Sequence, residues 1–252
     1  MFESLSLGPF GVLPSYNLMV GVGVLLGLLY FEKQNPNILE KQKFKLYNVL
    51  FISFVFGFFG SRFFELIYFS RTISINNLLT GGSTFMGGLF SALFISVITT
   101  SIYKLDYILT LNTFIPFIII SHFFGRIGCF LAGCCFGKET DCEIIGVTFP
   151  QNSIPFNHYG GYFSVHPTQL YEAVGLLFLF LFIRNKKNKI HPYLILYGLL
   201  RFQVEFFRND NRGEFLTEHF SPSQVFSILF ILIGSLILIK SKGPFLFKKS
   251  NI

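Results

Sequence analysis

Long apolar stretches alternate along the chain with short polar connections. Stretches that can cross about 30 Å of hydrocarbon, which takes about 20 helical residues, can be placed about seven times if modest interruptions are allowed. They cover residues 16–31, 46–69, 85–103, 107–131, 167–183, 191–207 and 222–239. The pattern predicts an all-α integral membrane protein with about seven transmembrane helices, and a single polytopic membrane domain over residues 1–252.

One long polar insertion interrupts this pattern, at about residues 133–165. Pro150, Pro155 and the Gly160-Gly161 pair disfavour a continuous helix there. We therefore expect a small extracytoplasmic cap built of loops or short strands.

Composition supports the membrane assignment. Hydrophobic residues make up 52% of the chain and charged residues only 13%, whereas about a quarter of the residues of a soluble protein are charged. The mean hydropathy of +0.58 and the 36 phenylalanines point the same way. An ordinary soluble enzyme is excluded.

The net charge of +7 is best explained by orientation in a membrane, because the basic residues lie in short clusters between apolar stretches. No nucleic-acid partner is expected. One set of loops carries thirteen Lys and Arg residues and the other set four. Since cytoplasmic loops are rich in both, the N-terminus is predicted outside and the C-terminus in the cytoplasm. No Lys or Arg precedes Lys33, so the first stretch is predicted to be a retained helix and not a cleaved signal peptide.

Six charged residues fall inside the predicted spans, where each costs at least about 2.5–3.5 kcal/mol on insertion scales. Two pairs have helical spacing and can neutralise themselves, while two residues have no local partner. The pairs are Arg62 with Glu65 and Arg201 with Glu205, and the others are Arg126 and Glu172. Structural pairing alone is one explanation, and a functional site is the other.

Two further patterns accompany these charges. His122, Arg126, Cys129 and Gly133 lie on one stripe of the fourth predicted span. The glycine-rich segment 81–88, which includes Gly87 and Gly88, can offer backbone N–H groups to an anion, although helix entry alone would need no ligand. Since a guanidinium group donates paired hydrogen bonds to phosphate, arginines from two spans are suited to a phospholipid head group. Transporters and flippases can share these features.

Four segments together resemble the prolipoprotein diacylglyceryl transferase family. They are GRIGCFLAGCCFG at 125–137, the glycine-rich segment 81–88, HPTQLYE at 166–172 and YGLLRFQVEFFR at 197–208. The resemblance implies a multi-pass enzyme of the bacterial inner membrane. Its partners would be phosphatidylglycerol, membrane lipid and a prolipoprotein signal peptide, and it would use no cofactor and no metal.

The implied reaction transfers a diacylglyceryl group to the thiol of the lipobox cysteine and releases glycerol phosphate, as a step in lipoprotein biosynthesis. The implied binding residues for phosphatidylglycerol are Arg126, Arg201, Tyr197, Gly87 and Gly88. Arg201 would also stabilise the leaving phosphate. Because a thiol attacks as thiolate, a base or positive field is needed, and the candidates are Glu205, His166 and His122. A related membrane lipid transferase with another acceptor, a lipid-binding paralogue or a transporter are the alternatives.

The chain departs from the family pattern at four positions. Cys129 and Ala132 stand where the family usually has Asn, Cys134 where it has Glu, and Met86 where it has His. Met cannot accept a proton, and neither Ala nor Cys replaces an amide or carboxylate hydrogen bond. The acceptor and the base are therefore left open.

The four cysteines, Cys129, Cys134, Cys135 and Cys142, allow several states. Cys142 can form a disulfide with Cys134 or Cys135, or all four can be reduced and packed as small residues. A metal site, with His158 as a further ligand, lacks the C-x2-C spacing typical of zinc motifs. A catalytic or acylated thiol is the remaining possibility.

Overall fold

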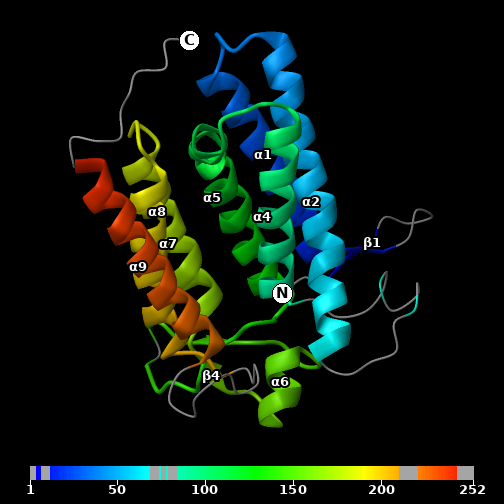
Figure 1. The fold of residues 1–252 in the computed structure, drawn as a ribbon. Coiled ribbons are helices and arrows are strands. Elements are labelled where there is room, and N and C mark those ends of the chain that lie inside the picture. Colours follow the sequence, from blue (N-terminus) through cyan, green and yellow to red (C-terminus); the bar gives the residue numbers. More distant parts are fainter. Residues whose placement is uncertain are drawn as a thin grey trace. The chain divides into compact units, whose positions relative to one another are not determined.

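The computed structural model describes residues 4–6, 12–68, 74, 78, 84–142, 144–209 and 221–242. The long helices are α1 (Ser15–Gln34), α2 (Glu40–Tyr68), α4 (Phe85–Ile102), α5 (Tyr107–Leu131), α7 (Thr168–Ile183), α8 (Ile190–Glu205) and α9 (Pro222–Lys242) (Figure 1). The short elements are β1 (Ser4–Ser6), β2 (Val12–Pro14), β3 (Val147–Thr148), α6 (Ile154–Tyr159) and β4 (Ser164–Val165). The predicted all-α class is confirmed, with helices on the predicted apolar stretches and α2 beginning earlier than expected, at Glu40.

Four of these helices are long and apolar enough to cross a membrane: Ser15–Gln34, Glu40–Ile67, Tyr107–Leu131 and Pro222–Lys240. Two further apolar segments, Gly87–Ile102 and Thr168–Ile183, are shorter. The number of crossings and the placement of the two termini stay predictions.

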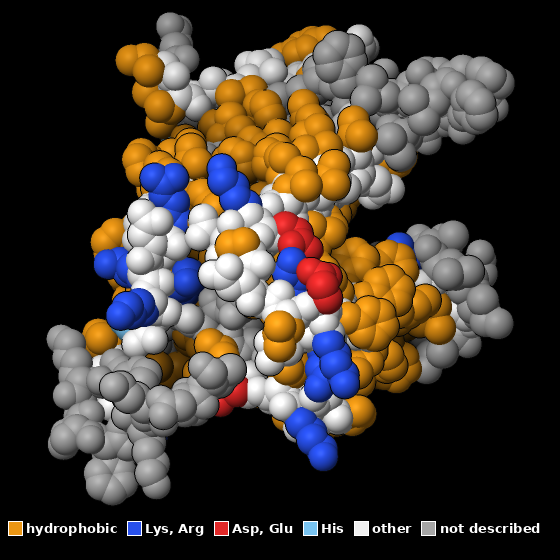
Figure 2. All heavy atoms as spheres, turned by 90° about the horizontal axis from the view of Figure 1, so that it is seen from above, with side chains coloured by type: hydrophobic (Ala, Val, Ile, Leu, Met, Phe, Trp, Pro, Cys, Tyr) orange, Lys and Arg blue, Asp and Glu red, His pale blue; other side chains and the backbone are white. Residues whose placement is uncertain are grey.

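Many large apolar side chains lie on the outside of the helices, whereas several charged ones are buried. Phe94 and Phe178 are 70% and 67% exposed, whereas Glu172 is completely buried. Figure 2 shows hydrophobic side chains over much of the visible face, with Lys and Arg side chains gathered among them. A water-soluble protein rarely exposes so much apolar surface, and this distribution is typical of a protein whose helices face lipid.

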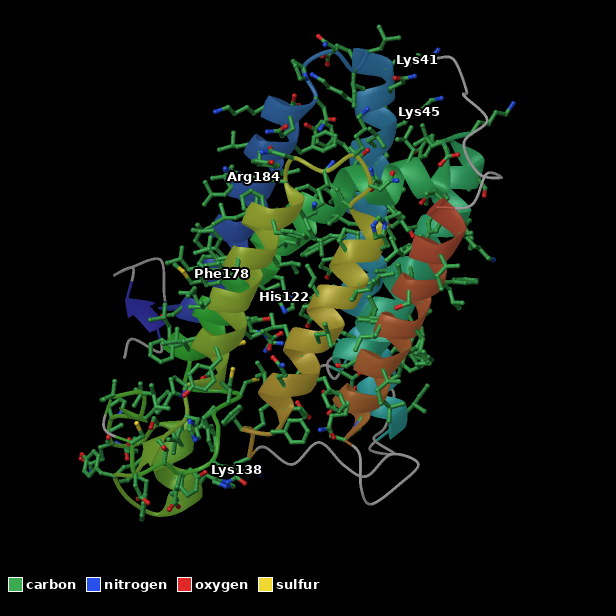
Figure 3. All side chains as sticks on the ribbon, turned by 90° about the vertical axis from the view of Figure 1, so that its left-hand side faces the viewer. Lys41, Lys45, His122, Lys138, Phe178 and Arg184 are labelled. Atoms are coloured by element: carbon green, nitrogen blue, oxygen red, sulfur yellow. The ribbon has the colours of Figure 1, made fainter. Side chains whose placement is uncertain are left out.

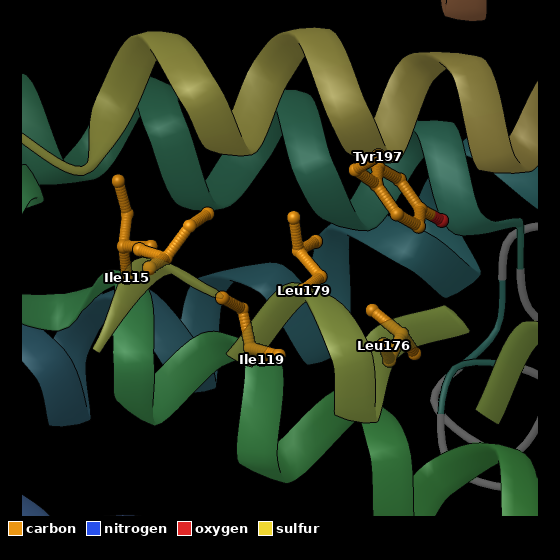
Figure 4. Packing of buried hydrophobic residues seen from close by; sticks show 6 residues of the cluster. Ile115, Ile119, Leu176, Leu179 and Tyr197 are labelled. Carbon is orange, nitrogen blue, oxygen red and sulfur yellow. The ribbon is translucent and has the colours of Figure 1, made fainter. Parts of the chain in front are cut away.

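The chain forms two compact units, one of residues 1–34 and 114–252 and one of residues 35–113. In the first unit α5, α7 and α8 share an apolar core of Ile115, Ile119, Leu176, Leu179, Ile183 and Tyr197 (Figure 4). Glycines bring neighbouring helices close: a Cβ on Gly23 of α1 would lie 2.8 Å from Phe124 of α5. Helices α8 and α9 approach in the same way, where a Cβ on Gly198 would lie 2.8 Å from the Ser227 carbonyl oxygen.

In the second unit, small residues let α2 and α4 pack closely. A Cβ on Gly87 would lie 2.8 Å from the Gly60 carbonyl oxygen, and one on Gly88 would lie 3.2 Å from that of Gly57. Gly87 and Gly88 therefore have a packing role in the crossing of the two helices. Residues 81–83 of the glycine-rich segment and the side chain of Met86 lie outside the described residues.

The insertion at 133–165 folds as the predicted mixture of loops and short strands, with one short helix in addition. Strands β3 and β4 pair antiparallel, and α6 begins after Ser153, whose hydroxyl accepts from the Phe156 N–H at 3.3 Å. The insertion is tied to the end of α8 at Gly137, which bridges to Arg208. Phe136, Phe149 and Val165 form its own small core.

Replacing Gly137 by alanine is expected to loosen this tie. The new Cβ would lie 2.5 Å from the Phe207 carbonyl oxygen and 2.6 Å from that of His166, which are backbone atoms. We expect a loss of about 1–3 kcal/mol in the free energy of unfolding, as in other overpacked sites. Thermal unfolding of the purified protein in detergent measures this loss. Gly161→Ala is the control, because its Cβ would meet only the Phe163 ring at 3.5 Å, and an equal shift in both variants would contradict the explanation.

Candidate functional site

Glu172, near the start of α7, is the centre of a buried polar cluster. Its Oε1 atom accepts a hydrogen bond from the Tyr197 hydroxyl at 3.0 Å and lies 3.0 Å from Arg126 Nη2 and 3.4 Å from His122 Nε2. Arg126 and His122 belong to α5 and Tyr197 to α8, so one carboxylate joins three helices. Arg126 and Glu172, which lack local partners in the sequence, are thus partners of each other.

Arg201 of α8 extends the cluster towards α9. Its Nη1 lies 4.0 Å from Glu172 Oε2, and its Nη2 lies 2.7 Å from Glu205 Oε2. The same Nη2 donates a hydrogen bond to the Ser223 hydroxyl at 2.9 Å. The i, i+4 pairing of Arg201 with Glu205 that the spacing predicts is therefore present.

One donor of this guanidinium group is left over. Arg201 Nη1 is buried and has no hydrogen-bond partner among the described residues, and neither has Glu172 Oε2. A buried polar atom without a partner costs about 1–3 kcal/mol, and more when the group is charged. The Nη1 atom is therefore a donor to which an anionic ligand can bind at little further desolvation cost.

The second carboxylate, Glu205, lies between two arginines. Its Oε1 atom accepts from the Ser221 hydroxyl at 2.7 Å, and its Oε2 atom lies 3.9 Å from Arg208 Nε. Arg208 follows the end of α8 at Glu205, and yet it is only 6% exposed. The reason is the backbone bridge to Gly137, which holds this position under the insertion.

Three residues of the cluster escaped the sequence-based selection: Arg208, Ser221 and Ser223. Arg208 follows Glu205 by three residues, so helical spacing alone was a signal for it. Ser221 directly precedes α9, where a hydroxyl is common as a helix cap, and Ser223 lies in the first turn, so no local pattern sets the two serines apart.

His122 makes two contacts that need different protonation states of one nitrogen. Arg126 Nε donates a hydrogen bond to His122 Nε2 at 3.3 Å, which requires an unprotonated nitrogen. The same Nε2 lies 3.4 Å from Glu172 Oε1, where a proton would be favourable. His122 thus lies between the arginine and the carboxylate of the cluster.

The other predicted residues are not all in this cluster. His166 lies at the base of the insertion, where its Nδ1 is 2.9 Å from the Tyr171 hydroxyl and its ring packs against Phe207. Gly87 and Gly88 belong to the second unit. Arg62 is also there, with its guanidinium group 4.6 Å from the Phe58 ring centre.

The cysteines take an arrangement that their spacing does not reveal. All four cysteines are free in the structure, so of the alternatives left open by the sequence the disulfide of Cys142 is not formed. The sulfur atoms of Cys129, Cys134 and Cys135 all lie within 4.8 Å of one another, while Cys142 is exposed and outside this group. Cys135 has a positive φ of 62°, which is uncommon for a residue with a side chain.

The close contact of these sulfur atoms changes the pKa of the Cys135 thiol. The neighbouring thiols of Cys129 and Cys134 lower the pKa of the Cys135 thiol by hydrogen bonding to its charged form, and Arg208 and Arg126 lower it further. His158, considered as a metal ligand, instead packs against the Phe136 ring.

Glu172 lies near the start of α7, and Arg126 and Arg201 lie near the ends of α5 and α8, so the cluster is on the insertion side of the first unit. Figure 3 places Arg184 and Lys138 towards its opposite ends and His122 between them. Charged side chains from α5, α7 and α8 thus meet among helices whose outer faces are apolar. Such an arrangement has the charge needed to bind an anionic group.

Comparison with known protein families and individual proteins supports the resemblance found in the sequence. The sequence profile described as "Prolipoprotein diacylglyceryl transferase" matches residues 4–240. A Clostridium perfringens protein named phosphatidylglycerol–prolipoprotein diacylglyceryl transferase 2 is 31% identical over 236 residues, which cover 89% of each chain. The proteins of Clostridium tetani and Rickettsia felis with the same name, without the number, are each 30% identical, covering 93% and 94% of this chain and 94% and 95% of their own lengths.

Proposed function

The chain belongs to the prolipoprotein diacylglyceryl transferase family, and we propose on that basis that it transfers the diacylglyceryl group of phosphatidylglycerol to a cysteine thiol of a prolipoprotein. The protein is a membrane transferase of lipoprotein biosynthesis. The unused donor on Arg201 Nη1 is the observation that links this activity to the polar cluster.

In this proposal Arg126 and Arg201 bind the phosphate of phosphatidylglycerol beside the Glu172 carboxylate. Both arginines contact Glu172, whose carboxylate holds their guanidinium groups apart at fixed positions. As the bond from the glyceryl carbon to the phosphate oxygen breaks, negative charge grows on the leaving glycerol phosphate. Positive groups that are already in place stabilise that charge without reorganisation.

We call Arg126 and Arg201 the phosphate clamp, and the remaining residues of the cluster position it. Glu205 and Ser223 fix Arg201 Nη2, and the Tyr197 hydroxyl fixes Glu172. His122, His166 and Glu205 stay candidates for the base, with His122 in contact with the clamp itself.

The membrane arrangement completes the proposal. The protein would cross the bacterial inner membrane about seven times, with its N-terminus outside, its C-terminus in the cytoplasm and the insertion at 133–165 on the outer side. The loop distribution of Lys and Arg supports this orientation. The outer side is also where the lipobox cysteine of a signal peptide would become accessible.

Transfer is tested directly with the purified protein, phosphatidylglycerol vesicles and a lipobox peptide under reducing conditions. We expect a peptide whose mass has increased by a diacylglyceryl group through a thioether, together with free glycerol phosphate. A peptide with serine in place of cysteine should stay unmodified. Absence of product here, and no rescue of a strain that lacks its own transferase, would favour a lipid-binding protein or a transferase with another acceptor.

A further inference from the structure

The three gathered cysteines are not explained by the phosphate clamp. Cys129 is 8% exposed at the end of α5, and Cys134 and Cys135 follow in the first turn of the insertion. With all three sulfurs within 4.8 Å of one another, they form a triangle. Tetrahedral zinc with Zn–S bonds of about 2.3 Å separates its sulfur ligands by about 3.8 Å, so small side-chain rotations suffice to close this triangle on one ion.

The backbone around the triangle is fixed in an unusual way. Gly133 and Cys135 have φ angles of 71° and 62°, and the Cys134 N–H donates to the Cys129 carbonyl oxygen at 3.1 Å. Positive φ is uncommon for a residue with a side chain and costs about 1–3 kcal/mol where it is imposed. The turn therefore holds both cysteines against Cys129 at an energetic cost.

Two buried side chains of α7 hold the turn from the other side. Gln169 Nε2 donates to the Cys134 carbonyl oxygen at 2.6 Å, and Thr168 Oγ1 donates to that of Cys135 at 2.7 Å. Both side chains are completely buried. In metal sites, hydrogen bonds from neighbouring residues typically orient the residues that bind the ion.

Charge also suits a bound cation. Three thiolates and one Zn²⁺ carry one net negative charge, and Arg126 lies on the same helix face as Cys129, about one turn away. Within the described residues no His, Asp, Glu or further Cys joins the three sulfurs. Structural zinc sites have four protein ligands, whereas catalytic ones have three and keep one position open for a reactant.

We propose that Cys129, Cys134 and Cys135 bind one Zn²⁺ ion whose open fourth position takes the acceptor cysteine of the prolipoprotein. This inference rests on the proposed function. On coordination the acceptor thiol releases its proton to water and becomes a thiolate. The thiolate sulfur then forms a bond to the glyceryl carbon, and the carbon–oxygen bond to phosphate breaks, with the electron pair leaving on glycerol phosphate. No oxidation or reduction occurs.

The position of the triangle fits this step. Arg126 contributes to the proposed phosphate clamp, and Cys129 is one turn further along α5. The attacking sulfur and the leaving phosphate would thus be held by neighbouring parts of one helix. Zinc would also supply the thiolate without the histidine that Met86 replaces in the family pattern.

Metal content is the first test. Protein purified with a reductant, loaded with Zn²⁺ and desalted should retain about one ion per chain, as expected for a single site with three cysteine ligands. Cys129→Ala and Cys134→Ala should lose it, while Cys142→Ala, at an exposed cysteine outside the triangle, should keep it. Equal zinc in the native protein and the Cys129→Ala/Cys134→Ala double variant would overturn the site, as would a disulfide among the three cysteines in the native protein.

The open position is tested on the native protein, so the result does not depend on the folding of a variant. Co²⁺ in place of Zn²⁺ should show sulfur-to-metal charge-transfer absorption, and a lipobox peptide should increase it as a fourth thiolate binds. A serine peptide should not change the spectrum. An unchanged spectrum with the cysteine peptide would refute the role in acceptor binding.

Activity separates this inference from the function on which it rests. Removal of the metal with a chelator should abolish transfer, and Zn²⁺ should restore it. Full transfer by the metal-depleted enzyme would overturn the inference and leave the proposed function intact. Metal and peptide binding without transfer by the loaded enzyme would instead contradict the proposed function.

Discussion

Replacing Arg201 by alanine is expected to reduce diacylglyceryl transfer by about 10²–10³-fold, the range for removal of one group that stabilises a developing oxyanion. Arg201 contacts both carboxylates and keeps one buried donor unused, so its loss removes the clamp and disturbs its neighbours. Initial rates of thioether formation with phosphatidylglycerol and a lipobox peptide measure the effect.

The conservative variant sharpens this test. Arg201→Lys keeps the charge, but an ammonium group cannot donate to Ser223 and Glu205 while presenting a further paired donor to phosphate. We expect most of the activity to be lost here too. Arg184→Ala is the matched control, because Arg184 is an exposed arginine at the end of α7. Transfer at the native rate in Arg201→Ala would refute the assignment of the clamp.

Much of the fold follows from hydropathy alone. The apolar stretches predict where the helices lie because a chain in lipid must satisfy its backbone hydrogen bonds within each helix. The start of α2 was misjudged, since Glu40 and the lysines after it are polar and yet continue the helix beyond the apolar segment. Helix ends in water do not depend on hydrophobicity, so hydropathy cannot locate them.

The site was only partly predictable. Arg126, Glu172 and Arg201 could be predicted because a charge within an apolar stretch is costly unless it binds a ligand or is paired. That Glu172 joins α5 and α8 is a fact of tertiary packing, which spacing along one helix cannot give. The cysteine triangle depends on a left-handed conformation at Cys135, which the residue type itself disfavours.

Replacing Glu172 by leucine is expected to destabilise the protein by about 3–5 kcal/mol, the cost of breaking a buried ion pair from one side. The carboxylate is completely buried and contacts Arg126, Arg201, His122 and Tyr197. Without it two guanidinium groups are left close together in an apolar surrounding. Thermal unfolding in detergent, followed by the loss of the monodisperse peak, measures the change.

Tyr197→Phe is the control for this prediction, because it removes one hydrogen bond to Glu172 and leaves the charges unchanged. We expect a smaller loss of about 1.5–3 kcal/mol there, the range for a hydrogen bond to a charged group. Phosphatidylglycerol should restore more stability to Glu172→Leu than phosphatidylcholine does, since the anionic head group can replace the missing negative charge between the arginines. Native-like unfolding of Glu172→Leu would show that the arginines are held without this carboxylate, and equal effects of the two lipids would contradict binding of an anion at that position.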